Sequence, residues 1–399
     1  MHGPLGPLPA AMMQTPKSRE KYLDGLRGLA AMQVVFQHYT LAFLPASLGR
    51  FGILADGNFA VFVFFVMSGF VLTPSFERRP HALMSGLGRR AIRLGLPAAI
   101  ACVFAALLGV AWPGSAPVAA ALSGSSWLAG LLPVTLGQAF ADISGLSLIT
   151  GYAETTLFGP LAGLLPPWTA SVDPPVWSLH LELWGSVLVL LLVWLRACNP
   201  WLHAAALALC AGMIGVNALD LFALGSVLSL AARSRWFPAL IARRWRPALG
   251  VAIFLLGIWV EYGGLLPEAR WLERAGAARA LVRPFAWFSL SQEGAAVAIF
   301  AAVLLLPEVH FLLRTRLAQW LGKLSFAIYL LHFPVMTTLG TVAFTAAAGK
   351  TGKGAAAGLA LIVGLAATLP LAILFERVVD QNAIALSRRW GRRLMSAAV

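Results

Sequence analysis

One arginine and one histidine in the first strongly apolar segment are the side chains whose types and spacing best suit chemistry. Arg27 and His38 lie 11 residues apart, which on an α-helix is about 20° past three full turns. They would therefore share one helix face, about 16 Å apart along the axis. A histidine can exchange a proton near neutral pH, and an ionisable side chain inside a membrane is a candidate functional residue. The structural alternatives are an arginine that snorkels to the interface and a histidine that bonds a neighbouring helix.

Two further arginines follow the second apolar segment, where they could bind a phosphate-bearing ligand. Arg90 and Arg93 are three positions apart and are therefore neighbours on a helical turn. Guanidinium groups form forked, charge-assisted hydrogen bonds that match phosphate oxygens. The alternative is a pair of positive charges that only anchors a helix at the cytoplasmic interface.

A carboxylate and a set of polar residues lie inside two later apolar segments. Glu182 lies about one turn inside the segment that begins near residue 176, where an unpaired charge is costly. A carboxylate there could orient or activate a histidine, and an interhelical salt bridge is the alternative. Ser325, Tyr329 and His332 follow helical spacing, so one polar face would turn into the bundle. Packing hydrogen bonds would also explain that face.

The composition is that of a membrane protein. Hydrophobic residues make up 59% of the chain and charged residues 12%, whereas a soluble domain is about 25% charged. Apolar runs of about 20 residues recur, each long enough to cross about 30 Å of hydrocarbon. The net charge of +14 would suit a nucleic acid, but the sequence holds no basic arm or nucleic-acid motif. We therefore expect an all-α, polytopic membrane bundle with no nucleic-acid partner, and no metal site, because the cysteines lack CxxC or CxxH spacing.

The apolar segments predict about ten transmembrane helices. Most of the 30 lysines and arginines fall in segments on the side of the N-terminus, which places both termini in the cytoplasm. Residues 113–175 contain no lysine or arginine and many prolines. We predict an outer loop with short interfacial or re-entrant pieces there, and a hidden helix pair is the alternative. The predicted helices cover residues 26–45, 57–74, 94–112, 176–195, 201–216, 218–232, 248–262, 284–306, 324–346 and 355–376.

Three regions follow from this organisation. Residues 1–20 are predicted to be a disordered cytoplasmic tail, residues 21–378 the membrane domain, and residues 379–399 a basic cytoplasmic tail. We expect an integral membrane protein, placed in a bacterial inner membrane, with membrane lipid around it. The sequence does not reveal whether the protein forms a homo-oligomer.

In this order, the motifs resemble those of the acyltransferase 3 family of integral membrane acyltransferases over about residues 20–378. The matching pieces are Leu23-Asp-Gly-Leu-Arg-Gly-Leu-Ala-Ala with Arg27-x10-His38, Phe64-Phe-Val-Met-Ser-Gly-Phe70, Arg90-x-x-Arg93, Trp177-Ser-Leu-x-x-Glu182 and Leu321-Gly-x-x-Ser-Phe-x-x-Tyr-Leu-x-His332. The chain departs from the pattern at Leu183-Trp184, where a Phe/Tyr pair is usual, at Phe326, where Tyr is common, and at Glu376-Arg-Val, which lacks a proline.

The resemblance implies transfer of an acyl group, often acetyl, from a cytoplasmic acyl-CoA to a hydroxyl of a glycan, lipid or small metabolite. His38 would be the catalytic base, Arg27 would help to position the donor, and Arg90 and Arg93 would bind the CoA phosphates. Acyl-CoA would be a co-substrate, so no resident cofactor is expected. The fourth-helix and ninth-helix residues Trp177, Ser178, Tyr329 and His332 are predicted to contact substrate.

Two mechanisms and a competing class stay open. His38, aided by Glu182, could deprotonate the acceptor hydroxyl, or His38 could take the acyl group first in a two-step relay. A polytopic transporter or flippase is the competing class, because intramembrane ionisable residues also mark permeation paths. Transporters often show repeats and paired broken helices, and neither is evident in this sequence.

Overall fold

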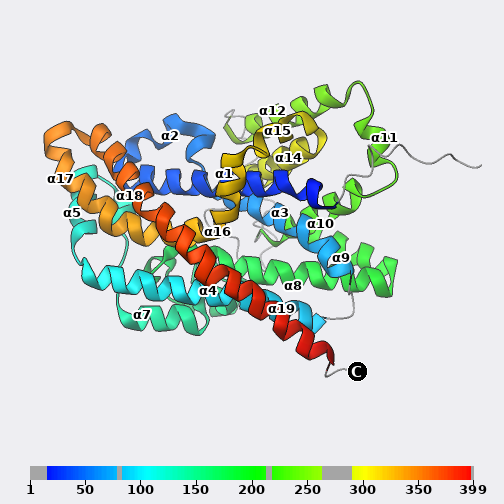
Figure 1. The fold of residues 1–399 in the computed structure, drawn as a ribbon, viewed down its shortest axis with the longest axis horizontal. Coiled ribbons are helices and arrows are strands. Elements are labelled where there is room, and N and C mark those ends of the chain that lie inside the picture. The colour runs from blue at the N-terminus through cyan, green and yellow to red at the C-terminus, as the bar shows by residue number, and fades with distance from the viewer. Residues whose placement is uncertain (1–15, 79–82, 213–217, 263–289, 397–399) are drawn as a thin grey trace, which may run out of the picture.

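The computed structural model describes residues 16–78, 83–212, 218–262 and 290–396, and every regular element in those ranges is helical. The predicted all-α class is confirmed (Figure 1). The first helix, α1 (Pro16–Phe43), begins well before residue 26, where the sequence places the start of the first apolar helix. The predicted tail over residues 1–20 falls mostly outside the described residues. Residues 1–15 lie outside the described part of the chain.

Each predicted apolar segment contains a helix, but length and composition do not qualify all of them as membrane spans. Within the described residues five stretches qualify: Pro45–Glu77, Leu83–Ala111, Pro174–Cys198, Arg316–Thr351 and Lys353–Gly391. A sixth would join Leu290–Leu305 and Pro307–Leu313, which meet at 85°. The count of ten spans therefore stays a prediction. The principal helices are α3 (Gly57–Glu77), α4 (Leu83–Ala111), α8 (Trp177–Cys198), α9 (Pro200–Gly212), α10 (Leu219–Ala232), α12 (Arg246–Tyr262), α14 (Leu290–Leu305), α16 (Arg316–Val335), α17 (Thr341–Thr351) and α18 (Lys353–Phe375).

The long helices run roughly side by side along one direction of the molecule (Figure 1). The short helix α2 (Leu48–Phe51), α5 (Ser115–Ser123) and α17 gather at one end. The start of α1 and the end of α19 (Gln381–Ser396) lie toward the other end. This agrees with termini on one side, and the assignment of that side to the cytoplasm stays a prediction from the charge pattern.

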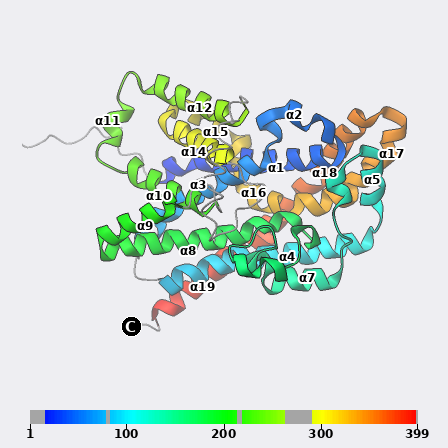
Figure 2. The ribbon, with the colours of Figure 1, turned by 180° about the vertical axis from the view of Figure 1, so that it is seen from behind.

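The stretch from residue 113 to residue 175 is a folded cap made of short pieces. It contains α5, α6 (Ser126–Ala129), α7 (Leu136–Ala141) and the kinked η4 (Asp142–Thr150), none of which is long enough to cross a membrane. The prediction of short pieces is therefore confirmed over the hidden helix pair. Their location on the outer side of the membrane stays a prediction from the charge pattern. Figure 2 shows α7 alongside α4, with α8 close by.

A buried carboxylate holds part of this cap together. Asp142 accepts hydrogen bonds from the Tyr152 hydroxyl at 2.8 Å, the Ser171 hydroxyl at 2.9 Å and the Val172 amide at 3.0 Å. Burial raises the pKa of Asp142, while these three donors act to lower it. The carboxylate thus ties η4 to the segment that leads into α8.

A close approach in the core joins α1 to α16, and glycines make it possible. A Cβ atom added at Gly322 would lie 2.0 Å from the carbonyl oxygen of Asp24, and one at Gly28 would lie 2.5 Å from the amide nitrogen of Gly322. Small residues let two backbones approach closely inside a bundle. The contact sets Arg27 of α1 and Lys323 of α16 beside the same cavity.

Gly322→Ala is expected to push α1 away from α16 and to lower the free energy of unfolding by about 1–3 kcal/mol, because the methyl group has no space. Gly349→Ala is the matched control, since Gly349 is exposed in α17 and has no atom within 4 Å of its added Cβ. Thermal unfolding of the purified variants measures both. Equal stability of the two variants would contradict this packing.

The basic C-terminal segment is a helix that continues from α18. The π-helical turn η10 (Glu376–Asp380) joins α18 to α19, and α19 packs across α4 (Figure 1). The Ser85 hydroxyl donates to the carbonyl of Gly391 at 3.4 Å. The part of α19 up to Gly391 therefore packs against α4, and Asp380 of η10 lines a cavity.

Candidate active site

Two histidines from distant parts of the chain form the centre of the candidate site. The Nδ1 atom of His38 on α1 lies 2.8 Å from the Nε2 atom of His332 on α16. The other nitrogen of His332, Nδ1, lies 3.0 Å from the carbonyl oxygen of Ile328. His332 is fully buried, whereas His38 is only partly buried. The imidazole of His38 is thus the accessible one of the pair, and the buried imidazole of His332 supports it from behind.

Aromatic side chains fix the plane of His38. Its ring stacks on Trp127 with a centroid distance of 5.5 Å and an interplanar angle of 17°. Phe333 meets it edge-on at 5.5 Å. Trp127 belongs to the short helix α6 of the cap, so the cap completes the site.

The first cavity, which we call the histidine cavity, opens beside His38. It spans about 720 Å³ of empty space, part of which is open to solvent. Its wall combines aromatic and apolar side chains with two amides, and His38 is the titratable residue in it. The lining residues are Gln37, His38, Leu41, Asn58, Trp127, Trp168, Pro174, Pro175 and Trp177.

The second cavity, which we call the arginine cavity, lies toward the start of α1 and holds a cluster of cations. It spans about 870 Å³, including space open to solvent, and is lined by Arg27 from α1, Arg90 and Arg93 from α4 and Lys323 from α16. Val61, Phe64, Phe65, Leu94, Leu179 and Phe326 supply its apolar wall. Cations beside an apolar surface suit a ligand with phosphates at one end and a less polar arm.

An ion pair in this cavity positions one of the arginines. Arg90 and Glu182 form a salt bridge in which their side chains are only 12% and 13% exposed. The Ser68 hydroxyl also donates to Glu182, at 2.7 Å, and the Arg90 Nε–H donates to the Ser186 hydroxyl at 2.7 Å. Arg90 therefore serves first to neutralise a largely buried carboxylate, while Arg93 is exposed.

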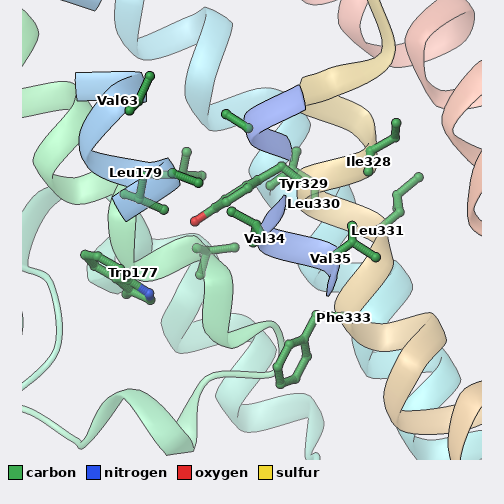
Figure 3. Packing of buried hydrophobic residues seen from close by; sticks show 14 of the residues in the cluster. Val34, Val35, Val63, Trp177, Leu179, Ile328, Tyr329, Leu330, Leu331 and Phe333 are labelled. Carbon is green, nitrogen blue, oxygen red and sulfur yellow. The ribbon is translucent and has the colours of Figure 1, made fainter. Parts of the chain in front are cut away.

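The two cavities share no lining residue and are separated by a wall between α8 and α16. The hydroxyls of Ser178 and Tyr329 lie 2.7 Å apart, and Tyr329 donates to the carbonyl of Pro175 at 2.8 Å. Figure 3 shows Tyr329 reaching from α16 toward α8, between Val34 and Leu179. The Tyr329 and His332 rings have centroids 6.1 Å apart. Tyr329, His332 and His38 thus lead from one cavity to the other.

The structure distributes the predicted site residues over these two cavities. Arg27, Arg90, Arg93, Ser178, Tyr329 and Glu182 line the arginine cavity, and His38 and Trp177 line the histidine cavity. His332 lines neither of them and lies behind His38. Arg27 also forms an ion pair with Asp24, three positions earlier on α1, at 3.7 Å, and the two side chains are 33% and 47% exposed.

Glu182 does not take the place that the sequence suggested for it. Its side-chain hydrogen bonds in the described structure go to Ser68 and Arg90, and none joins it to His38. The cause is the orientation of α8, which turns Glu182 toward α4 and leaves Trp177, at its N-terminal end, beside His38. The alternative of an interhelical salt bridge describes Glu182 correctly.

Several residues of the site escaped the sequence analysis. Trp127, Gln37 and Asn58 line the histidine cavity, and Lys323 and Asp380 line the arginine cavity. Gln37 directly precedes His38, and Lys323 lies within the ninth-segment motif, so both carried a usable signal. Trp127 and Asp380 carried none, because only the fold of the cap and of η10 brings them to the cavities.

The comparisons with known proteins agree with this arrangement. The family model of the acyltransferase domain of the acyltransferase 3 family matches residues 20–377. The chain is similar to the O-acetyltransferase PaAT-1 of Phomopsis amygdali, with 26% identity over 383 residues that cover 80% of this chain and 72% of that protein. No solved structure matches the chain. The match over nearly the whole length confirms the expected family: the protein belongs to the acyltransferase 3 family.

Proposed function

We propose that this protein transfers an acyl group, with acetyl as the expected group, from acyl-CoA to a hydroxyl, and that His38 is the base. The observation that carries the proposal is that one continuous helix, α1, contributes Arg27 to the wall of the arginine cavity and His38 to the wall of the histidine cavity. Arg27 and His38 are separated along this helix by about 16 Å, a length of the same order as a pantetheine arm. The name of the similar O-acetyltransferase supports both the acetyl group and the hydroxyl acceptor.

The arginine cavity suits the CoA part of the donor. The phosphates of CoA would bind Arg27 and Arg93. Arg90 is less available to them, because it forms a salt bridge with the largely buried Glu182. Lys323 could contribute as well, although it also pairs with Glu376 at 3.2 Å. The apolar wall of the cavity would contact the pantetheine arm. The thioester end would then reach His38 past the wall formed by Ser178 and Tyr329.

The histidine cavity suits the acceptor. His38 would remove the proton of the acceptor hydroxyl as the oxygen attacks the thioester carbonyl. The new C–O bond forms as the C–S bond breaks, and the proton held by His38 passes to the departing CoA thiolate. Trp177 would contact the acceptor from the opposite wall. In the relay alternative, His38 carries the acyl group itself before the hydroxyl attacks.

Arg93→Gln is expected to raise the Kd for CoA about tenfold, because a charge-assisted hydrogen bond to phosphate is lost. The Kd can be measured by titration calorimetry on the purified protein. Arg50→Gln is the control, because Arg50 is an exposed arginine of α2 that lines neither cavity. An unchanged Kd for Arg93→Gln, or an equal change for Arg50→Gln, would contradict the placement of the donor.

The setting of the reaction follows from the charge pattern and the apolar helices. The arginine cavity lies toward the end of the molecule that holds the start of α1, which the charge pattern assigns to the cytoplasm, where acyl-CoA is found. The bacterial inner membrane stays a prediction of the sequence alone. Membership of an acyltransferase family leaves the transporter alternative without a supporting observation.

A further inference from the structure

We infer that His332 is a positioning residue: it accepts a hydrogen bond from His38 and thereby aims the basic nitrogen of His38 into the histidine cavity. The inference rests on the proposed function, because it assumes that His38 is the base. It adds a role for a buried residue that touches neither donor nor acceptor in the arrangement proposed above.

The hydrogen-bond chain fixes the protonation of both rings. The carbonyl oxygen of Ile328 can only accept, so the Nδ1 of His332, 3.0 Å away, carries the proton. The Nε2 of a neutral His332 is then an acceptor, and the Nδ1 of His38, 2.8 Å from it, must donate. A neutral His38 with its proton on Nδ1 has its lone pair on Nε2. That nitrogen is the one available to take a proton from the acceptor.

The surroundings of His332 make it a rigid support. It is fully buried in α16, next to the buried Tyr329, and Pro334 follows it in the same helix. Its ring lies nearly parallel to that of His38, with 18° between the planes. The histidine of a Ser-His-Asp triad is held in its tautomer by a carboxylate in the same way. Here a neutral imidazole takes that place, and it stays bonded when His38 becomes protonated.

Three substitutions, His332→Gln, His332→Asn and His332→Leu, separate this role from packing. A glutamine carbonyl can reach the position of the imidazole Nε2 and accept from His38, whereas an asparagine carbonyl reaches only the position of Nδ1. We expect His332→Gln to keep kcat within about tenfold of the wild type. His332→Asn and His332→Leu should lower kcat by about 100-fold, with an unchanged KM for acetyl-CoA.

The measurement is steady-state release of CoA during acyl transfer by the full-length protein, with CoA binding as the check on folding. If His332→Leu binds CoA normally and keeps wild-type kcat, His332 does not position the base. If His332→Gln is as slow as His332→Leu while both bind CoA, the acceptor at Nε2 is not what matters, and the inference is wrong. His38→Ala, assayed alongside, distinguishes a failure of the proposed function from a failure of the positioning role. An active His38→Ala overturns the proposed function itself. An inactive His38→Ala with an active His332→Leu overturns only the positioning role.

Discussion

Replacing His38 by alanine is expected to lower acyl transfer by about 10²- to 10⁴-fold, because the variant has no base for the acceptor hydroxyl. His38 is the titratable side chain in the wall of the histidine cavity, and His332, 2.8 Å from it, does not line that cavity. No other base in that wall can therefore replace His38. The assay follows label from acetyl-CoA into alkali-labile ester in membranes that contain the protein. Donor binding should persist, since the two cavities have separate walls.

His203→Ala provides the matched control for this experiment. His203 lies in α9, where its Nδ1 atom contacts the carbonyl of Leu192 at 3.0 Å, and it lines neither cavity. We expect its transfer rate to equal that of the wild type. Trapped acyl-enzyme in the wild type that disappears in His38→Ala would select the relay over direct attack. A normal rate for His38→Ala would end both mechanisms.

Replacing Arg90 by methionine is expected to lower the free energy of unfolding by about 3–5 kcal/mol, the range for breaking a buried ion pair from one side. The substitution would leave the Glu182 carboxylate, 13% exposed, with the Ser68 hydroxyl as its remaining donor. The midpoint of thermal unfolding in nanodiscs measures the effect. Donor binding should weaken as well, because the cavity loses a positive charge.

The double variant Arg90→Met/Glu182→Gln isolates the cause. Neutralising Glu182 removes the uncompensated charge, so most of the lost stability should return while donor binding stays weak. Arg196→Met is the control, because the Arg196–Glu77 pair is 48% and 25% exposed and should contribute at most about 1 kcal/mol. A double variant as unstable as Arg90→Met would contradict the assigned role of this ion pair.

The helices that carry the site were predictable because each joins a long apolar run to polar residues at helical spacing. The shared face of Arg27 and His38 depends only on helix geometry, and α1 is continuous through both positions. Arg90 and Arg93 also share one cavity wall, as their spacing of three suggests. The ordered motifs identified the family from the sequence, and the family match confirms it.

The contacts between helices were not predictable in the same way. His38 and His332 are 294 positions apart, and their contact depends on the close packing of α1 against α16. Helical spacing shows which residues share a face but does not identify the helix that the face will meet. For that reason Glu182 could be read as a partner of a histidine, although α8 turns it toward Arg90. The cap that brings Trp127 to His38 has no periodic pattern to read.

The most direct test is a cryo-electron microscopy structure of the protein in nanodiscs with a thioether analogue of acetyl-CoA that cannot transfer its acyl group. The account predicts phosphate oxygens within hydrogen-bond distance, about 2.7–3.2 Å, of Arg27 or Arg93. It also predicts that the carbonyl carbon of the analogue lies beside His38, with room of about 3–3.5 Å for an acceptor oxygen between them. A CoA moiety bound outside the arginine cavity, or an acyl end that points away from His38, would contradict it.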